Sequence, residues 1–119
     1  MMKAYCARAM DELACELAVQ HDAELQAALK RIGAELVNPF RLRTSSCHDD
    51  PCDLVAENSR LLLAADVLLA NLSLRDYSYV GAIFELAEAV AGGVPVVAYV
   101  GETSLADRVY LQAHADFLC

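Results

Sequence analysis

The stretch from residue 64 to residue 100 constrains the fold most, because it reads in succession as a strand, a loop, a helix and a second strand. Polar residues bracket the apolar run 67–70, which is typical of a buried parallel strand whose carboxyl end opens toward a cleft. A helix then begins near Gly81, and another apolar run follows at 96–100. One glutamate, Glu85, interrupts the apolar face of this helix, and a carboxylate in such a place indicates chemistry.

Helices and apolar strands alternate along the rest of the chain as well. Asp50 precedes Pro51, which suits the first helical position after a cap. Ser104, with Asp107 three residues later, resembles a capping box and predicts a last helix. The other predicted elements are a strand at 3–7, a helix at 11–32 and a strand at 36–37, and the helix after Gly81 is expected to bury one stripe formed by Ile83, Leu86, Ala87 and Val90.

This alternation predicts an α/β fold, a Rossmann-like (flavodoxin-like) three-layer sandwich. We expect a parallel sheet of four to five strands with helices on both faces. With 119 residues, 57% of them hydrophobic, the chain has enough apolar side chains for one core and none for a second. The sequence therefore predicts a single domain over residues 1–119.

The composition excludes several classes of partner. A net charge of −8 argues against binding of nucleic acid, which needs a basic face. No apolar run is long enough to span a bilayer, and no signal-type segment opens the chain, so we expect a cytoplasmic protein that does not bind membranes.

Five cysteines form an odd set without a secretion signal, which favours free thiols in a reducing compartment. The tightest cluster, residues 47–52, offers two cysteines and one histidine. Structural zinc sites need four ligands in paired short spacings, so this cluster does not predict a metal site. We expect neither a metal nor a cofactor.

Topology alone predicts where a ligand binds. In an open parallel sheet, ligands lie beyond the carboxyl ends of the strands at the point where the strand order reverses. Tyr5, Asn71 and the helix start at Gly81 are all expected at that edge, with Glu85 close behind.

The region from Asp66 to Pro95 resembles the nucleoside 2-deoxyribosyltransferase family, which includes related deoxynucleoside 5′-monophosphate N-glycosidases. The family has an aspartate before an apolar strand, a Gly-x-x-x-Glu-Leu-Gly helix opening and a Gly-Lys-Pro-type turn. Asp66, Gly81, Glu85, Leu86 and Pro95 match this pattern. The resemblance covers most of the chain and identifies residues 1–119 as one domain similar to this family.

The resemblance implies an enzyme that cleaves or exchanges the N-glycosidic bond of a (deoxy)nucleoside or its 5′-monophosphate. Glu85 would attack the anomeric carbon and form a glycosyl-enzyme intermediate. Asp66 would help to protonate the leaving base, and Tyr5 would orient Glu85 through a hydrogen bond.

The resemblance also suggests residues that bind substrate. Arg8 follows the first strand, where the monophosphate hydrolases have an arginine-bearing loop, and it could bind phosphate together with Ser78 and the helix start at Gly81. Tyr79 replaces the aspartate or serine that the family has six residues before its glutamate. Further candidates for contact with the sugar or base are Asn71 and Asp76.

Three alternatives stay open. Tyr79 and a first loop poor in glycine also fit a nucleotide-binding module that kept the fold and lost the chemistry. A phosphoribohydrolase of the lysine-decarboxylase-like class is disfavoured, because the chain has no Pro-Gly-Gly-x-Gly-Thr run. A flavin-binding or receiver-type domain would share the fold without the site residues.

The expected partners are a small-molecule nucleoside or nucleotide and further copies of this chain. In the family that the chain resembles, neighbouring subunits complete each other's sites through residues near the carboxyl end. The resemblance therefore implies a homodimer or a higher homo-oligomer, although the short tail 116–119 leaves little chain to reach a neighbour.

Overall fold

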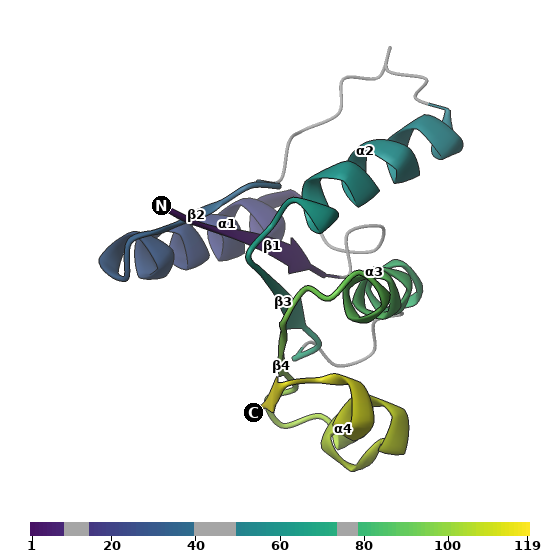
Figure 1. Cartoon of the computed structure of the whole chain (residues 1–119). Helices are drawn as coiled ribbons and strands as arrows, with labels where there is room; N and C mark the ends of the chain where they lie inside the picture. Colours follow the sequence, from purple (N-terminus) through teal and green to yellow (C-terminus); the bar gives the residue numbers. More distant parts are fainter. Residues whose placement is uncertain (9–14, 40–49, 74–78) are drawn as a thin grey trace.

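A computed structural model of the chain, which describes residues 1–8, 15–39, 50–73 and 79–119, contains a five-stranded sheet with helices on both faces (Figure 1). All neighbouring strands are parallel, and the strand order is β2-β1-β3-β4-β5. The chain moves outward from β1 to β2 and then returns to β3, so the order reverses between β1 and β3. This is the predicted α/β architecture. The strands are β1 (Met2–Ala7), β2 (Ala34–Leu36), β3 (Val67–Asn71), β4 (Val96–Tyr99) and β5 (Phe117–Leu118).

The helices connect these strands. They are α1 (Cys15–Arg31), α2 (Pro51–Leu63), α3 (Val80–Ala91) and α4 (Val109–His114), with a 3₁₀ turn, η1 (Ser104–Asp107), before α4. The longest of them, α1, has 17 residues, and no helix in the described ranges is both long and apolar enough to cross a membrane.

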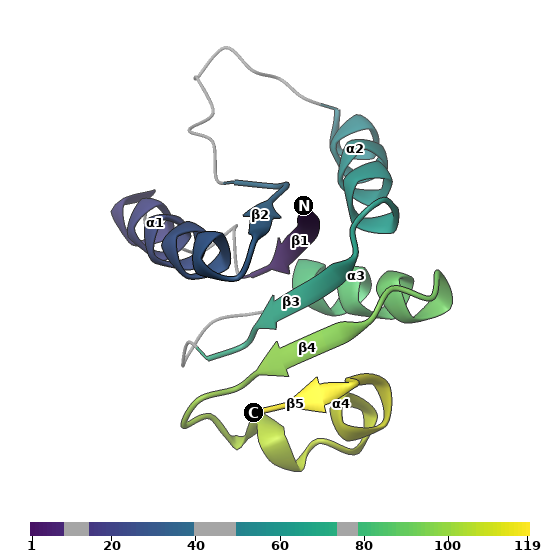
Figure 2. The same cartoon turned by 60° about the vertical axis from the view of Figure 1, so that its left-hand side comes forward.

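The two faces of the sheet are covered unequally (Figure 2). Side chains alternate along a strand, so Ala4 of β1 packs against Leu29 of α1, whereas Tyr5 points into the larger core with Leu62 of α2 and Leu86 of α3. We call the face that carries Ala4 the α1 face and the face that carries Tyr5 the α3 face. Of the described helices, α1 alone covers the α1 face, while α2, α3 and α4 lie along the α3 face.

The predicted apolar stripe of α3 is wrong in part. Leu86 is buried as expected, but its buried companions are Ala82 and Ala89. Ile83 and Val90 of the predicted stripe are 50% and 38% exposed. The helix is apolar nearly all round, and the small alanine side chains allow it to pack closely on the sheet, so the larger residues face outward.

Of the two helix starts predicted from capping signals, one is confirmed and the other is wrong. The start at Pro51 is confirmed, because the Asp50 carboxylate accepts a hydrogen bond of 2.8 Å from the backbone N–H of Cys52. The predicted cap at Ser104 is wrong: Thr103 precedes η1, and the extended backbone of Arg108 separates this turn from α4.

The end of the chain is a structural element that the sequence did not suggest. Phe117 pairs with Val97, and Leu118 pairs with Ala98, so the last residues form β5 in parallel with β4. The backbone N–H of Val100 also donates to the carbonyl of Cys119 at 2.7 Å. The residues read as a tail are therefore the outer strand of the sheet.

Candidate active site

Glu85 of α3 interacts with Tyr5 of β1 on the α3 face. Glu85 lies five residues after the start of α3, about 7.5 Å along the helix axis. Tyr5 lies two residues before the end of β1, about 6.6 Å along the strand. Both residues are therefore at a similar depth below the carboxyl edge, and the Tyr5 hydroxyl donates a hydrogen bond that lowers the pKa of Glu85.

The environment of Glu85 opposes its ionisation. Burial raises the pKa of this carboxyl group and is the largest effect, while the hydrogen bond from Tyr5 and the charge of Arg8 lower it and the charge of Glu88 raises it. Among the described residues, Oε2 of Glu85 is buried without a hydrogen-bond partner. A buried carboxylate oxygen that is not held by the protein is poorly solvated, and such groups concentrate at functional sites.

Tyr5 is suited to be a neutral donor. Its side chain is 1% exposed, and burial together with the nearby Glu85 carboxylate raises the pKa of its hydroxyl. The phenol therefore stays protonated at physiological pH and can donate a hydrogen bond to Glu85. The structure thus brings Tyr5 and Glu85 together as expected.

Asp66 is in the wrong place for the predicted role as proton donor. It precedes β3 at the amino end of the sheet, where its carboxylate accepts from the backbone N–H of Lys3 at 2.7 Å and its own N–H donates to the carbonyl of Lys3 at 2.8 Å. Five residues, about 16 Å of extended strand, separate it from Asn71 at the carboxyl end. Asp66 therefore joins β1 to β3 and lies away from the edge where a substrate would bind.

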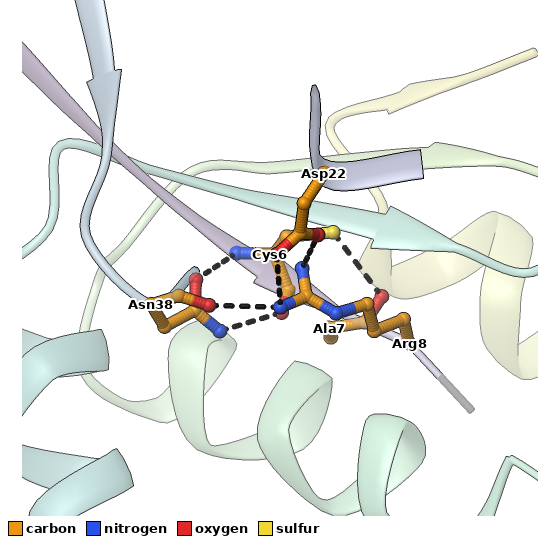
Figure 3. A network of polar contacts seen from close by, with 5 residues as sticks. All are labelled: Cys6, Ala7, Arg8, Asp22 and Asn38. Atoms are coloured by element: carbon orange, nitrogen blue, oxygen red, sulfur yellow. Dashed lines mark hydrogen bonds and ion pairs between the residues drawn. The ribbon is translucent and has the colours of Figure 1, made fainter. Parts of the chain in front are cut away.

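Arg8 is also placed differently from its predicted phosphate-binding role (Figure 3). Its side chain is 4% exposed, and its guanidinium group lies 3.0 Å from the Asp22 carboxylate of α1. A further hydrogen bond of 2.8 Å joins it to the backbone carbonyl of Asn38. These partners and this burial are those of a structural ion pair and disfavour a phosphate-binding role for Arg8.

Asn71 ends β3 at the carboxyl edge, where it shapes the following loop. Its side-chain oxygen accepts from the hydroxyl and the backbone N–H of Ser73, at 2.6 Å and 3.2 Å. Asp76 and Ser78, which were predicted to bind substrate, lie outside the described residues.

The start of α3 has the predicted position. Tyr79 precedes it, half-buried against the core, and its carbonyl accepts from the backbone N–H of Ile83 at 2.8 Å. Gly81 lies in the first turn, and a Cβ atom at this position would meet nothing within 4 Å. Packing within the described chain therefore does not require a glycine here, and the space beside it is open.

Two residues near the site were missed by sequence reasoning. Asp22 is a buried carboxylate within α1, and no pattern in that helix distinguishes it from the exposed Glu24. Asn38 continues the pairing of β1 with β2 by means of its side chain, which accepts from the N–H of Cys6 and donates to the carbonyl of Cys6, both at 2.8 Å (Figure 3). The only sequence signal for Asn38 is its place directly after an apolar strand.

Within the described residues, no group of three or more histidine, cysteine, aspartate or glutamate side chains could hold a metal ion. Of the cluster at residues 47–52, residues 47–49 lie outside these residues.

No family model matches the sequence, and no curated protein matches it significantly. Solved structures do resemble it. A 2-deoxyribosyltransferase of Bacillus psychrosaccharolyticus is 15% identical, with a TM-score of 0.74 over 98% of this chain and 85% of that one. The CMP N-glycosidase BcmB of Clostridium botulinum is 17% identical, with a TM-score of 0.68 over 98% and 86%. A 2-deoxyribosyltransferase of Leishmania mexicana is 20% identical, with a TM-score of 0.68 over 87% and 67%.

These identities are low, so the likeness establishes the fold. The chain has the fold of 2-deoxyribosyltransferases and of a CMP N-glycosidase, which matches the family that its sequence resembles. A fold alone does not fix an activity, which has to be argued from the residues of the site.

Proposed function

We propose that this protein is an enzyme that cleaves or exchanges the N-glycosidic bond of a (deoxy)nucleoside or its 5′-monophosphate, with Glu85 as the nucleophile. The observation that supports this most directly is the pairing of the buried Tyr5 with the half-buried Glu85, whose Oε2 is buried, below the carboxyl edge of the sheet. Solved enzymes of the same fold are a 2-deoxyribosyltransferase and a CMP N-glycosidase, which is consistent with this choice of reaction.

The reaction proceeds in two displacements. A carboxylate oxygen of Glu85 forms a bond to the anomeric carbon, the bond from that carbon to the base nitrogen breaks, and its electron pair leaves with the base. The base then takes up a proton. Water or a second base next attacks the anomeric carbon and releases Glu85, so the same intermediate serves hydrolysis and exchange.

We do not propose Asp66 as the source of the proton on the leaving base, because it bonds to Lys3 at the other edge of the sheet. Asp76, in the stretch between β3 and α3, stays a prediction as a residue near the sugar or base, as does Ser78. The hydrogen bond from Tyr5 favours the ionised carboxylate of Glu85, and its Oε2, which has no partner among the described residues, is left to face the sugar.

The test compares Glu85→Gln with Glu88→Gln. Glu88 lies nearly one turn further along α3 and accepts a hydrogen bond of 3.0 Å from Ser59, so it is a matched carboxylate outside the proposed chemistry. Wild-type protein and both variants are incubated with nucleosides, deoxynucleosides and 5′-monophosphates, with and without an added free base, and the products are separated by chromatography.

Base release or exchange should fall about 10³-fold or more in Glu85→Gln and persist in Glu88→Gln. The lanes with added base separate exchange from hydrolysis. Intact mass spectrometry of acid-quenched wild-type protein should show one added glycosyl group that Glu85→Gln lacks. Equal activity in the wild type and in Glu85→Gln would reject this role of Glu85. Binding without turnover in folded wild-type protein would favour the nucleotide-binding module.

We also propose that the protein works as a homodimer built on the outer side of α3. Val80, Ile83 and Phe84 are 64%, 50% and 73% exposed, and Ala87 and Val90 continue the same apolar stripe. No charged residue belongs to this stripe, although the chain carries a net charge of −8. A second copy can approach this uncharged face without repulsion between acidic residues, which favours self-association over a charged partner.

The stripe is too small to be a complete interface. A stable interface buries about 800 Å² on each partner, which exceeds what a few aliphatic residues and one phenylalanine provide. We therefore expect the interface to extend to Val109 and Tyr110 at the start of α4, which are 74% and 82% exposed. Sedimentation analysis of Ile83→Lys should show a monomer, whereas Ile32→Lys, an exposed control beyond the end of α1, should leave the dimer intact. A wild-type protein that stays monomeric at high concentration would reject this interface.

A further inference from the structure

Asn71, the last residue of β3, carries a nearly buried amide at the carboxyl edge of the sheet. Its side-chain oxygen accepts two hydrogen bonds from Ser73, one from the hydroxyl at 2.6 Å and one from the backbone N–H at 3.2 Å. A backbone N–H can only donate, so the atom that faces it is the oxygen, and this contact fixes the orientation of the amide. The NH₂ group of Asn71 therefore points away from Ser73.

This NH₂ group has no use within the described part of the chain. Among the described residues, Nδ2 of Asn71 makes no hydrogen bond, although the residue is only 9% exposed. An amide donor that is nearly buried without a partner costs free energy, and native proteins rarely keep one without a reason. The strand order reverses between β1 and β3, and ligands of such sheets bind beyond the strand ends at this point. A ligand atom that accepts a hydrogen bond would satisfy the donor.

The turn that orients Asn71 is held from the side of β4. Gly101 lies two residues after the end of β4 with a φ of +56°, and a Cβ atom at this position would lie 3.2 Å from the Cβ atom of Ser73. The hydroxyl of Thr103 also reaches the backbone carbonyl of Leu72, at 3.4 Å. The glycine allows the two loops to approach closely, so the amide of Asn71 is oriented before a ligand arrives.

Tyr99 of β4 provides a second group beside Asn71. The two residues pair in register, so their side chains stand on the same face of neighbouring strands. Tyr99 is half-buried, yet within the described ranges it belongs to neither apolar cluster and its hydroxyl makes no hydrogen bond. Burial raises the pKa of this hydroxyl, so the phenol stays neutral. An amide donor beside an aromatic ring suits a planar group with an acceptor atom, which a nucleobase provides.

We propose that the side-chain NH₂ group of Asn71 binds the base of the substrate by donating to a carbonyl oxygen or a ring nitrogen, with Tyr99 beside that base. The choice of a base as the ligand rests on the proposed function. No contact between Asn71 and Glu85 is required. Because Ser73 already occupies the amide oxygen, this position can recognise only an acceptor, and a carboxylate here would lose the interaction.

The test measures binding without turnover, by NMR of ¹⁵N-labelled protein in the Glu85→Gln background. The probes are adenine, hypoxanthine, cytosine, uracil, 2-deoxyribose and the deoxynucleosides of these bases. The NH₂ signals of Asn71, which Asn71→Asp lacks, should shift with at least one free base. Asn71→Asp keeps the oxygen that Ser73 needs and deletes the donor, so the Kd of the matching deoxynucleoside should rise about tenfold or more. The same change at the half-buried Asn58 of α2, Asn58→Asp, is the control and should leave this Kd unchanged.

An amide that only closes the turn with Ser73 would tolerate Asn71→Asp. An unchanged Kd and unshifted NH₂ signals in folded protein would therefore overturn the proposal. A shift with 2-deoxyribose and with none of the bases would overturn the assignment to the base. If Asn71→Asp does not fold, the NH₂ signals of Asn71, assigned through their bonds to the backbone, decide the question.

The failure of this proposal differs from the failure of the proposed function. Binding of a base through Asn71 in a wild-type protein without turnover would reject the chemistry of Glu85 and retain the binding site. Turnover that is lost in Glu85→Gln, together with unchanged binding in Asn71→Asp, would do the reverse. A folded wild-type protein that binds none of the probes would reject both.

Discussion

The two faces of the sheet hold buried charges in opposite ways. On the α1 face, Arg8 is bound by Asp22 and by the carbonyl of Asn38. On the α3 face, Glu85 has the phenol of Tyr5, while its Oε2 has no hydrogen-bond partner among the described residues. The first arrangement connects α1, β1 and the end of β2. The second leaves a poorly satisfied group near the edge where ligands bind in such sheets. The difference suggests that the ion-paired Arg8 organises this fold, and that Glu85, which is held by a phenol instead of a cation, does the chemistry.

The largest loss of stability is expected when the ion pair between Arg8 and Asp22 is broken. Asp22→Ala leaves the guanidinium group of Arg8 buried without its carboxylate, so the free energy of unfolding should fall by about 3 kcal/mol. Glu57→Ala, which removes an exposed ion pair with Arg60 at 2.6 Å, is the control and should change little. Urea denaturation of both variants checks this. Similar losses in the two would mean that the buried pair does not organise the fold.

A smaller effect is expected on activity when the hydroxyl of Tyr5, the donor to Glu85 within the described part of the chain, is removed. Tyr5→Phe keeps the packing of the ring and deletes the hydroxyl, so kcat should fall about tenfold, the value of one hydrogen bond to a charged group. The acidic limb of the pH profile should also move to higher pH, because that hydrogen bond lowers the pKa of Glu85. Steady-state kinetics from acid to neutral pH measure both. An unchanged profile would show that Tyr5 only fills the core.

The unsatisfied carboxylate should itself reduce stability. Burial raises the pKa of Glu85 above its ordinary value, so the folded state binds the proton more tightly than the unfolded state. Stability should therefore fall as the pH rises from the ordinary glutamate pKa through the folded one, and the cost persists above it. Glu85→Gln removes this cost and should be more stable than the wild type at neutral pH, with no gain well below the ordinary glutamate pKa. Thermal melts of the wild type and of Glu85→Gln from acid to neutral pH test this expectation. A variant that is less stable than the wild type at neutral pH would contradict it.

The smallest effect on stability is expected at Gly81, at the start of α3. A substitution there tests whether this glycine serves the fold or the binding of substrate. Gly81→Ala meets no atom within 4 Å and suits a helix better, so stability should rise by about 0.5 kcal/mol. If a substrate approaches the backbone here, KM should rise nonetheless. Thermal melts and kinetics of one preparation test both points, and an unchanged KM would remove Gly81 from the candidate site.

Much of the fold could be predicted because it depends on local signals. The run before Asn71 is apolar as a buried strand requires, and Asp50 with Pro51 marks a helix start that the structure confirms. The short strand β5 could not be predicted, since two residues, Phe117 and Leu118, form a strand only because β4 offers a free edge. The prediction of which α3 residues are buried failed for a related reason. The sequence of a helix that is apolar on several sides does not reveal which side meets the sheet.

The candidate site could be predicted only where the order of strands and helices in the fold brings its residues together. Tyr5 and Glu85 meet because a strand and the helix packed on it share one face. The predicted role of Asp66 failed because it came from the family resemblance alone: a residue that precedes a parallel strand lies at the amino edge of the sheet, away from the edge where ligands bind. Arg8 failed because its partner, Asp22, lies on another element, and no spacing rule relates the two.

The side chain of Asn38 stands in for a strand residue, and this has a consequence for how the protein ages. Its amide accepts from and donates to Cys6, so hydrolysis of that amide to a carboxylate would abolish the donor and place a negative charge against a carbonyl. Asparagine usually deamidates when the next backbone nitrogen attacks its side chain. Here the next residue is Pro39, whose nitrogen has no hydrogen and cannot complete that cyclisation. The joint between β1 and the end of β2 is therefore protected from the commonest spontaneous damage to an asparagine.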